Sequence, residues 1–149
     1  MPETPHYQRP DWFTRNLVNP FLNLLMRLGI SVRGSRVLEH RGRRSGQPHH
    51  IPVNLLDFES AQYLVAARGE TEWVRNVRAA DGHLVLILGR RRDERTAVEV
   101  PPAERTPVLR AYLAKWAFEV GTFFQGVGPD STDEEFAAIA EQHPVFVLR

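Results

Sequence analysis

The sequence contains no cysteine, and its 149 residues include a single lysine, Lys115. Without cysteine the chain can form no disulfide, no thiolate metal site and no cysteine nucleophile, which fits a reducing, cytoplasmic location. The formal net charge is only +1, which argues against a dedicated nucleic-acid-binding protein. No uninterrupted apolar run reaches the ~20 residues that a membrane-spanning helix needs. A Gly-x-Gly-x-x-Gly motif is also absent, so a Rossmann-type nicotinamide site is unsupported.

The most informative segment is the turn at residues 42–46, in which two glycines bracket Arg43, Arg44 and Ser45. Glycine lets successive backbone N–H groups point into one concavity, and such a concavity attracts anions. The guanidinium group of arginine matches phosphate oxygens in shape and charge. The turn therefore indicates a phosphate-binding loop, and the alternative is a solvated, arginine-rich hairpin turn.

Residues that could perform catalysis directly do not form a recognisable site. His49 and His50 are adjacent, so on a strand they point to opposite faces and cannot chelate one metal ion. Ser45 lies outside any Gly-x-Ser-x-Gly motif, and no partner base for it is evident. We predict no metal site and no catalytic side chain. A phosphate-binding turn without a nucleophile indicates instead that a cofactor supplies the chemistry.

Hydrophobic patterning predicts a flexible arm at residues 1–10 and one domain at residues 11–149. Residues 11–29 form an amphipathic pattern, which predicts a helix packed on the domain as a lid; peripheral contact with a membrane is the alternative. Strands are expected over residues 35–39, 50–58, 61–68, 83–88, 95–100 and 143–148, helices over 72–80, 103–118 and 133–141, and a polar turn over 90–94. Thr71 and either Ser131 or Thr132 are the expected helix N-caps.

The absence of βαβ alternation predicts the fold class, which is α+β and mainly β. We expect a six-stranded, mostly antiparallel β-barrel with peripheral helices.

Four linked motifs carry a resemblance to a known family. They are G-R-R-S-G-Q-P at residues 42–48 with Pro52 and Val53 following, Y-L-V-A-A-R-G at 63–69, W-V-R-N-V at 73–77, and P-V-F-V-L at 144–148. In this order, over roughly residues 33–148, the chain resembles the deazaflavin-dependent nitroreductase and quinone reductase family, which binds coenzyme F420 on a split β-barrel. The resemblance implies hydride transfer from reduced coenzyme F420 to a hydrophobic acceptor such as a quinone or nitro compound.

The same resemblance implies a set of cofactor-binding residues, with the phosphate and anionic tail at the basic turn. The set is Arg43, Arg44, Ser45, Gly46, His49, Pro52, Val53, Ala66, Ala67, Arg68, Gly69, Trp73, Asn76 and Val77. Core packing is the alternative role for Trp73, and a helix-surface amide or local cap is the alternative for Asn76. Where many relatives carry a basic residue after the turn, this chain has His49, which would make binding of the tail weaker or pH-sensitive.

The acceptor pocket is expected to be aromatic. Many relatives place tyrosines before the closing strand, where this chain has residues 136–139, Phe-Ala-Ala-Ile. The expected lining residues are therefore Tyr112, Trp116, Phe124 and Phe136, and core packing is the alternative role for the aromatic residues between 112 and 124.

The sequence leaves two further functional hypotheses open. One is a split-barrel protein that binds FMN, or that carries F420 without turnover. The other is a nucleic-acid or membrane-surface binder built on Arg41, Arg43, Arg44 and residues 90–92. The resemblance also leaves open a homodimer or a monomer whose first helix covers the flat barrel face.

Overall fold

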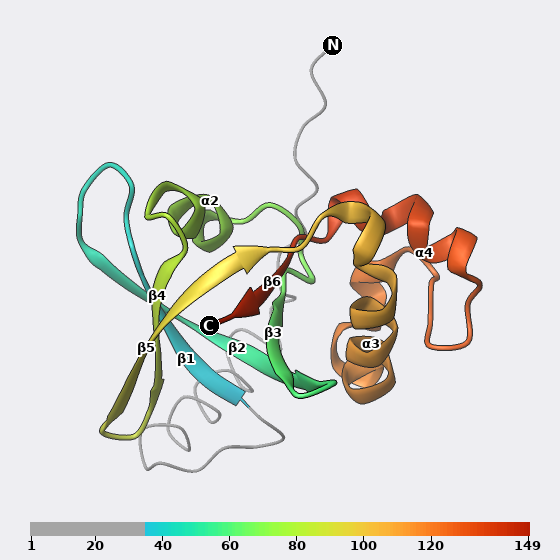
Figure 1. Cartoon of the computed structure of the whole chain (residues 1–149), viewed down its shortest axis with the longest axis horizontal. Helices are drawn as coiled ribbons and strands as arrows, with labels where there is room; N and C mark the ends of the chain where they lie inside the picture. The colour runs from blue at the N-terminus through green and yellow to red at the C-terminus, as the bar shows by residue number, and fades with distance from the viewer. Residues whose placement is uncertain (1–34) are drawn as a thin grey trace.

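Six antiparallel strands dominate residues 35–149, the part of the chain that the computed structural model describes (Figure 1). They are β1 (Ser35–Arg41), β2 (Pro48–Phe58), β3 (Ala61–Val65), β4 (His83–Leu88), β5 (Arg91–Glu99) and β6 (Val145–Leu148). They close into a barrel in the order β1-β2-β3-β6-β5-β4, with every neighbouring pair antiparallel. The fold class expected from the sequence is confirmed. The arm at residues 1–10 and the helix at 11–29 lie outside the described residues.

The longest strand, β2, belongs to both halves of the barrel. Its first half pairs with β1, ending at Ser35 opposite Asn54, and its second half pairs with β3, starting at Leu55 opposite Leu64. A two-residue turn joins β2 to β3, and both of its residues, Glu59 and Ser60, have positive φ angles of 48° and 66°. Such a turn matches the twist of the two flanking strands, so the hairpin predicted here is confirmed.

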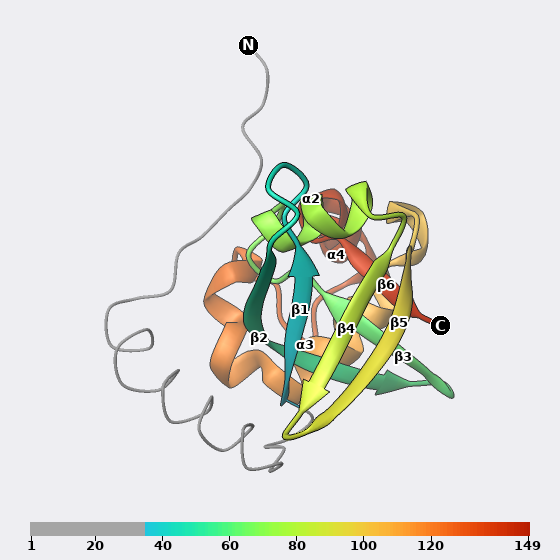
Figure 2. The same cartoon turned by 90° about the vertical axis from the view of Figure 1, so that its left-hand side faces the viewer.

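Two hydrophobic clusters stabilise the fold, one inside the barrel and one against its outer wall. The interior cluster contains Leu38, Leu55, Leu64, Leu84, Leu86 and Phe146, and helix α2 (Glu72–Ala79) closes it with Trp73, Val74 and Val77. The outer cluster lies beneath α3 (Thr106–Val120) and α4 (Asp133–Ile139). Figures 1 and 2 show α2 beside the loop between β1 and β2, with α3 and α4 at another side of the barrel.

Strand β5 and helix α3 begin at other residues than expected from the sequence. The polar turn expected at residues 90–94 is wrong: β5 already begins at Arg91, which pairs with Leu88, so only Gly89 and Arg90 form the turn. Backbone hydrogen bonds make the ladder, and the exposed side chains of this strand end can all be polar without weakening it. Helix α3 begins at Thr106, later than the expected start at residue 103, and the 3₁₀ turn η2 (Pro102–Glu104) precedes it.

The N-caps of α2 and α4 are formed in different ways. Thr132 and Glu135 make a capping box at the start of α4, which confirms this expected cap. Thr71 occupies the N-cap position of α2, but its side chain makes no capping hydrogen bond. Helix α4 ends at Ile139, where η4 (Ala140–Gln142) leads into the final strand.

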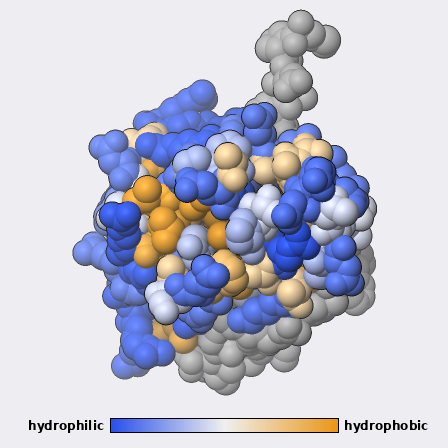
Figure 3. All heavy atoms as spheres, turned by 45° about the vertical axis from the view of Figure 1, so that its right-hand side comes forward, coloured by the Kyte–Doolittle hydropathy of each residue, from blue (hydrophilic) through white to orange (hydrophobic). Residues whose placement is uncertain are grey.

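The surface of the described region is largely hydrophilic. The face in Figure 3 is mostly blue, with its most hydrophobic atoms gathered near the left side of the view. Among the side chains that the structure describes, Val98 is the one large hydrophobic group that is exposed, at 40%. Within residues 35–149, no helix is long and apolar enough to span a bilayer, and no three His, Asp or Glu side chains are grouped to hold a metal ion.

Candidate functional site: the basic turn and helix α2

The turn between β1 and β2 is closed by backbone and side-chain hydrogen bonds. The N–H of Gly42 donates to the carbonyl of Gln47 (2.9 Å), and the N–H of Gly46 donates to the carbonyl of Gly42 (2.9 Å). Arg41 donates through Nη1 to the carbonyl of Gly46 (3.0 Å). Gly46 has a φ of +71°, a conformation that favours glycine. The turn is therefore a hydrogen-bonded loop, and its residues 43–46 are exposed.

Gly42 allows the turn to fold back on itself. A Cβ atom at this position would lie 2.6 Å from Ser45 Oγ and 3.0 Å from His49 Nε2. Ser45 Oγ accepts a hydrogen bond from the N–H of Gln47 (3.2 Å), which leaves its own hydroxyl proton available for a ligand. The absence of a side chain at Gly42 therefore brings the Ser45 hydroxyl and the His49 ring to one place.

Asn76, on the buried face of α2, ties this turn to the helix. It is 3% exposed. Its Oδ1 accepts hydrogen bonds from the backbone N–H of Arg43 (3.1 Å) and from Arg43 Nη1 (2.8 Å). Its Nδ2 lies 2.9 Å from Nδ1 of His40 on β1. Neither alternative role considered for Asn76, a surface amide or a local cap, describes this arrangement.

The two arginines of the turn differ in their partners. Arg43 also forms an ion pair with Glu72 of α2 (Nη1 to Oε2, 2.7 Å), and this hydrogen bond lowers the pKa of Glu72. Its charge is therefore compensated within the protein. Arg44 makes no hydrogen bond or ion pair with the described residues of the chain, and the same holds for the backbone N–H groups of Arg44 and Ser45. The groups left for an external anion are thus concentrated at Arg44 and Ser45.

The loop that follows β3 lies against the closing strand and leads into α2. The N–H of Ala66 donates to the carbonyl of Pro144 (2.8 Å), and the N–H of Gly69 donates to the carbonyl of Ala66 (3.0 Å). Gly69 has a φ of +87°, which reverses the chain before α2. The guanidinium carbon of Arg68 lies 5.6 Å from the centre of the Phe123 ring. This compact loop of small residues begins directly after a barrel strand.

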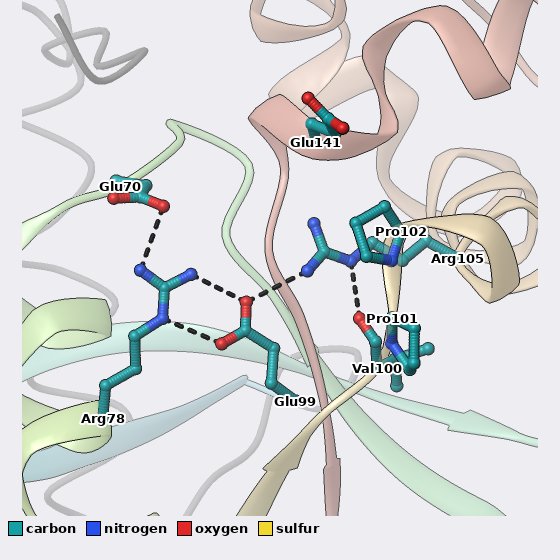
Figure 4. A pocket seen from close by; sticks show the side chains of 8 residues that line it. All are labelled: Glu70, Arg78, Glu99, Val100, Pro101, Pro102, Arg105 and Glu141. Atoms are coloured by element: carbon teal, nitrogen blue, oxygen red, sulfur yellow. Dashed lines mark hydrogen bonds and ion pairs between the residues drawn. The ribbon is translucent and has the colours of Figure 1, made fainter.

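An ion-pair network holds the chain next to this loop (Figure 4). Arg78 of α2 donates to Glu99 through two nitrogens (2.8 and 2.7 Å) and to Glu70 (2.9 Å). Arg105 donates to Glu99 (3.0 Å) and to the carbonyl of Val100 (2.7 Å). These hydrogen bonds lower the pKa of Glu99, while burial lowers the pKa of Arg105. The group lines an open pocket of about 400 Å³, together with Val100, Pro101 and Pro102, and connects the residue after Gly69 to β5.

The structure joins Arg43 to Asn76, two of the residues expected to bind a cofactor, and several others of that set are core residues. Trp73 is 7% exposed, and its ring packs 5.7 Å from that of Phe146. Val77 is fully buried, and Val53 packs against the interior cluster while Pro52 is exposed. Core packing, the alternative considered for Trp73, therefore describes its side chain.

The aromatic residues expected to line an acceptor pocket are buried in the outer cluster. Tyr112, Trp116, Phe124 and Phe136 are at most 3% exposed. Tyr112 packs on both Trp116 and Phe124, with ring centres 5.2 and 6.2 Å apart. In this structure they form the core between the barrel and α3, which is the alternative role considered for the aromatic residues between 112 and 124.

Sequence patterns missed His40 and Glu72 because each is a single polar residue outside the motifs. A signal was present for His40: it lies two residues after Leu38 and therefore on the same, inward face of β1. It is 4% exposed, and its ring stacks on that of His49 with centres 5.5 Å apart. Burial, followed by the nearby His49 and His50, lowers the pKa of His40 to about 4.

The lowered pKa of His40 predicts a loss of stability in mild acid. The unfolded chain binds this proton near pH 6.5 and the folded chain only near 4, so between these values the unfolded state holds more protons. The stability is complete above pH 6.5 and is lost as the pH falls towards 4. From about pH 7.5 to about pH 4.5, the unfolding free energy should fall by about 2 kcal/mol more in the wild type than in His40→Asn.

Urea unfolding of both proteins at the two pH values measures this difference. Subtracting the loss of the variant removes what the two proteins have in common and leaves the part that depends on His40. Equal losses in the two proteins would contradict the prediction.

Comparison with known proteins identifies the family. The model of the family described as F420H(2)-dependent quinone reductase matches residues 12–122. A search of curated proteins gave no match. One similar solved structure is an F420-H2-dependent reductase, which is 18% identical, covers 78% of this chain and 95% of its own, and has a TM-score of 0.53.

Two further solved structures share the fold. A chain described as a domain-swapped dimer is 16% identical over 91% of this chain and 98% of its own, with a TM-score of 0.56. A protein of unknown function from Agrobacterium tumefaciens str. C58 is 15% identical over 98% of this chain and 58% of its own, with a TM-score of 0.53. The family match spans most of the chain and agrees with the motifs at residues 42–48 and 73–77. The chain therefore belongs to the F420H(2)-dependent quinone reductase family, a family of F420-dependent reductases.

Proposed function

We propose that this protein reduces a hydrophobic acceptor of the quinone type with hydride from reduced coenzyme F420, and that the turn at residues 42–46 holds the phosphate and tail of the coenzyme. Nitro compounds are a second acceptor class in the same proposal. The observation that carries the assignment is the set of unpartnered donors at Arg44 and Ser45, on a turn already fixed by hydrogen bonds. The family to which the chain belongs supports the choice of coenzyme.

The groups at the turn fit an anionic coenzyme. A guanidinium, two backbone N–H groups and a hydroxyl are all hydrogen-bond donors, and such a set suits phosphate oxygens. The carboxylate of Glu72 is paired with Arg43, and this ion pair reduces its repulsion of an anion at Arg44. We propose that residues 66–69 and Val53 lie along the deazaflavin ring, where small side chains or backbone atoms allow a flat heterocycle to approach.

The protein's own part in this reaction is to bind and orient. The bound coenzyme would supply the hydride, and the acceptor would be reduced by direct transfer from the ring. The turn would anchor the charged end, while the barrel wall and the loop after β3 would hold the acceptor against the ring and exclude water. No side chain at the turn needs to act as a nucleophile.

Titration with coenzyme F420 tests the proposal, and Arg44→Gln tests the anchoring role of the turn. We expect wild-type protein to bind F420 in the micromolar range or tighter, and Arg44→Gln to raise the dissociation constant about tenfold, since a charge-assisted contact to phosphate is lost. Arg90→Gln is the matched control, because Arg90 is an equally exposed arginine in the turn between β4 and β5. It should bind F420 as the wild type does.

Parallel experiments separate the competing functions. Turnover of reduced F420 with menadione and with a nitroaromatic compound distinguishes a reductase from a carrier of the coenzyme. A tighter complex with FMN than with F420 would contradict the coenzyme assignment, and so would failure of the wild type to bind F420. The homodimer and the membrane contact of residues 11–29 stay predictions.

A further inference from the structure

We propose that His40 is a positioning residue of the basic turn: through Asn76 it fixes Arg43, and so leaves Arg44 and Ser45 as the preformed donors for an anion. The proposal rests on the proposed function, because it concerns the same turn. It adds a residue that lies outside every sequence motif of the site.

His40 is a polar residue in an otherwise apolar layer. Leu38 and His40 both face the barrel interior, at 0% and 4% exposure, whereas Glu39 between them faces outward and pairs with Arg92. A buried imidazole requires a hydrogen-bond partner. Asn76 supplies it from the helix that closes this end of the barrel, at 2.9 Å. His40 therefore lies within hydrogen-bond reach of the residue that ties α2 to the turn.

The hydrogen bonds around Asn76 run in one direction. The N–H and the Nη1 of Arg43 are both donors, so the Asn76 atom facing them must be its oxygen. The Nδ2 of Asn76 then donates to Nδ1 of His40, which must be the unprotonated nitrogen of a neutral ring. The reverse orientation of the amide would place an NH₂ group against two donors. A His40 ring that is neutral and unprotonated at Nδ1 thus matches the one orientation of Asn76 that can hold Arg43.

The consequence reaches the residues that would bind the ligand. Arg43 is held by two hydrogen bonds to Asn76 and by its ion pair with Glu72. The backbone is therefore fixed at the residue that directly precedes Arg44. The N–H groups of Arg44 and Ser45 follow directly. Donors that are already in place bind an anion at a lower cost in conformational entropy than donors on a mobile loop.

Two substitutions separate the acceptor atom of His40 from its bulk. His40→Leu removes the acceptor, and His40→Asn keeps an oxygen near the position of Nδ1. In protein without coenzyme, the amide proton of Arg43 should exchange with solvent about tenfold faster in His40→Leu than in the wild type, because its partner Asn76 is no longer oriented. The F420 dissociation constant should also rise about tenfold, with kcat at saturating coenzyme unchanged. His40→Asn should restore both values to within about threefold of the wild type.

The outcomes that overturn the proposal are distinct. Wild-type exchange at Arg43 together with wild-type affinity in His40→Leu would show that His40 does not position the turn. Equal losses in His40→Leu and His40→Asn would show that the bulk of the ring, and not its acceptor, is what the site needs. If His40→Leu does not fold, His40→Gln replaces it, since its oxygen reaches the position of Nε2 and leaves Asn76 without a partner. If the wild type binds no F420, the proposed function is overturned but the role of His40 is not. Amide exchange measures that role in protein without coenzyme.

Discussion

Gly82→Ala should destabilise the fold by about 4 kcal/mol, which places it among the most damaging single substitutions in this chain. Gly82 follows α2 with a φ of +88°, and an added Cβ would lie 2.2 Å from the backbone carbonyl oxygen of Ala97 on β5. The same two residues are joined by a hydrogen bond from the Ala97 N–H to the Gly82 carbonyl (2.7 Å). The substitution therefore adds backbone strain and also separates α2 from β5.

Gly126→Ala is the matched control for this prediction. Gly126 has a nearly equal φ of +84°, but an added Cβ would meet no atom within 4 Å. Its substitution should cost only the strain of the left-handed conformation, about 1 kcal/mol. Urea unfolding of the two variants measures both losses. Similar losses in the two would contradict the prediction, because they would show that the contact with Ala97 adds nothing.

Arg105→Met should reduce the unfolding free energy by about 3 kcal/mol. The side chain of Arg105 is 4% exposed and donates to the carbonyls of Val100 and Ala140 and to the carboxylate of Glu99. Methionine fills a similar volume but donates to none of them, so the buried carbonyl of Ala140 and the partly buried carbonyl of Val100 lose their side-chain donor. Glu99 keeps Arg78 as a partner, which limits the loss at that carboxylate.

Arg110→Met provides the control, since Arg110 has the same kinds of partner in a more exposed place. It donates to the carbonyls of Pro129 and Ser131 and pairs with Asp133, but its side chain is 35% exposed. Water can replace these hydrogen bonds, so the loss should be about 1 kcal/mol or less. Differential scanning calorimetry or urea unfolding gives both values, and an Arg110→Met loss as large as that of Arg105→Met would refute the role of burial.

Local patterns were sufficient where the physical cause is local. The two-residue turn at Glu59 and Ser60, the capping box at Thr132, and the whole of β4 follow from short stretches of sequence. The start of β5 could not be predicted in this way. Its first residues are all exposed and polar, and only the partner strand β4 makes them a strand.

The candidate site shows the same division. The motif at residues 42–48 was enough to indicate an anion-binding turn, because glycine and arginine carry that chemistry in themselves. The different partners of Arg43 and Arg44 were not predictable, since Glu72 and Asn76 come from a helix about thirty residues later. The four aromatic residues of the outer cluster were assigned to a pocket from their type, whereas their burial depends on how the helices pack on the barrel.

The sequence by itself determined the class of the fold and the family, and it predicted the type of ligand for the turn, because alternation, glycine placement and side-chain charge act over a few neighbouring residues. Only the tertiary structure decided which arginine is free for that ligand and which is held within the protein. It also placed His40, from β1, next to Asn76 of α2. The physical reason is that hydrogen-bond partners and exposure are properties of the closed barrel, in which residues distant in the chain meet.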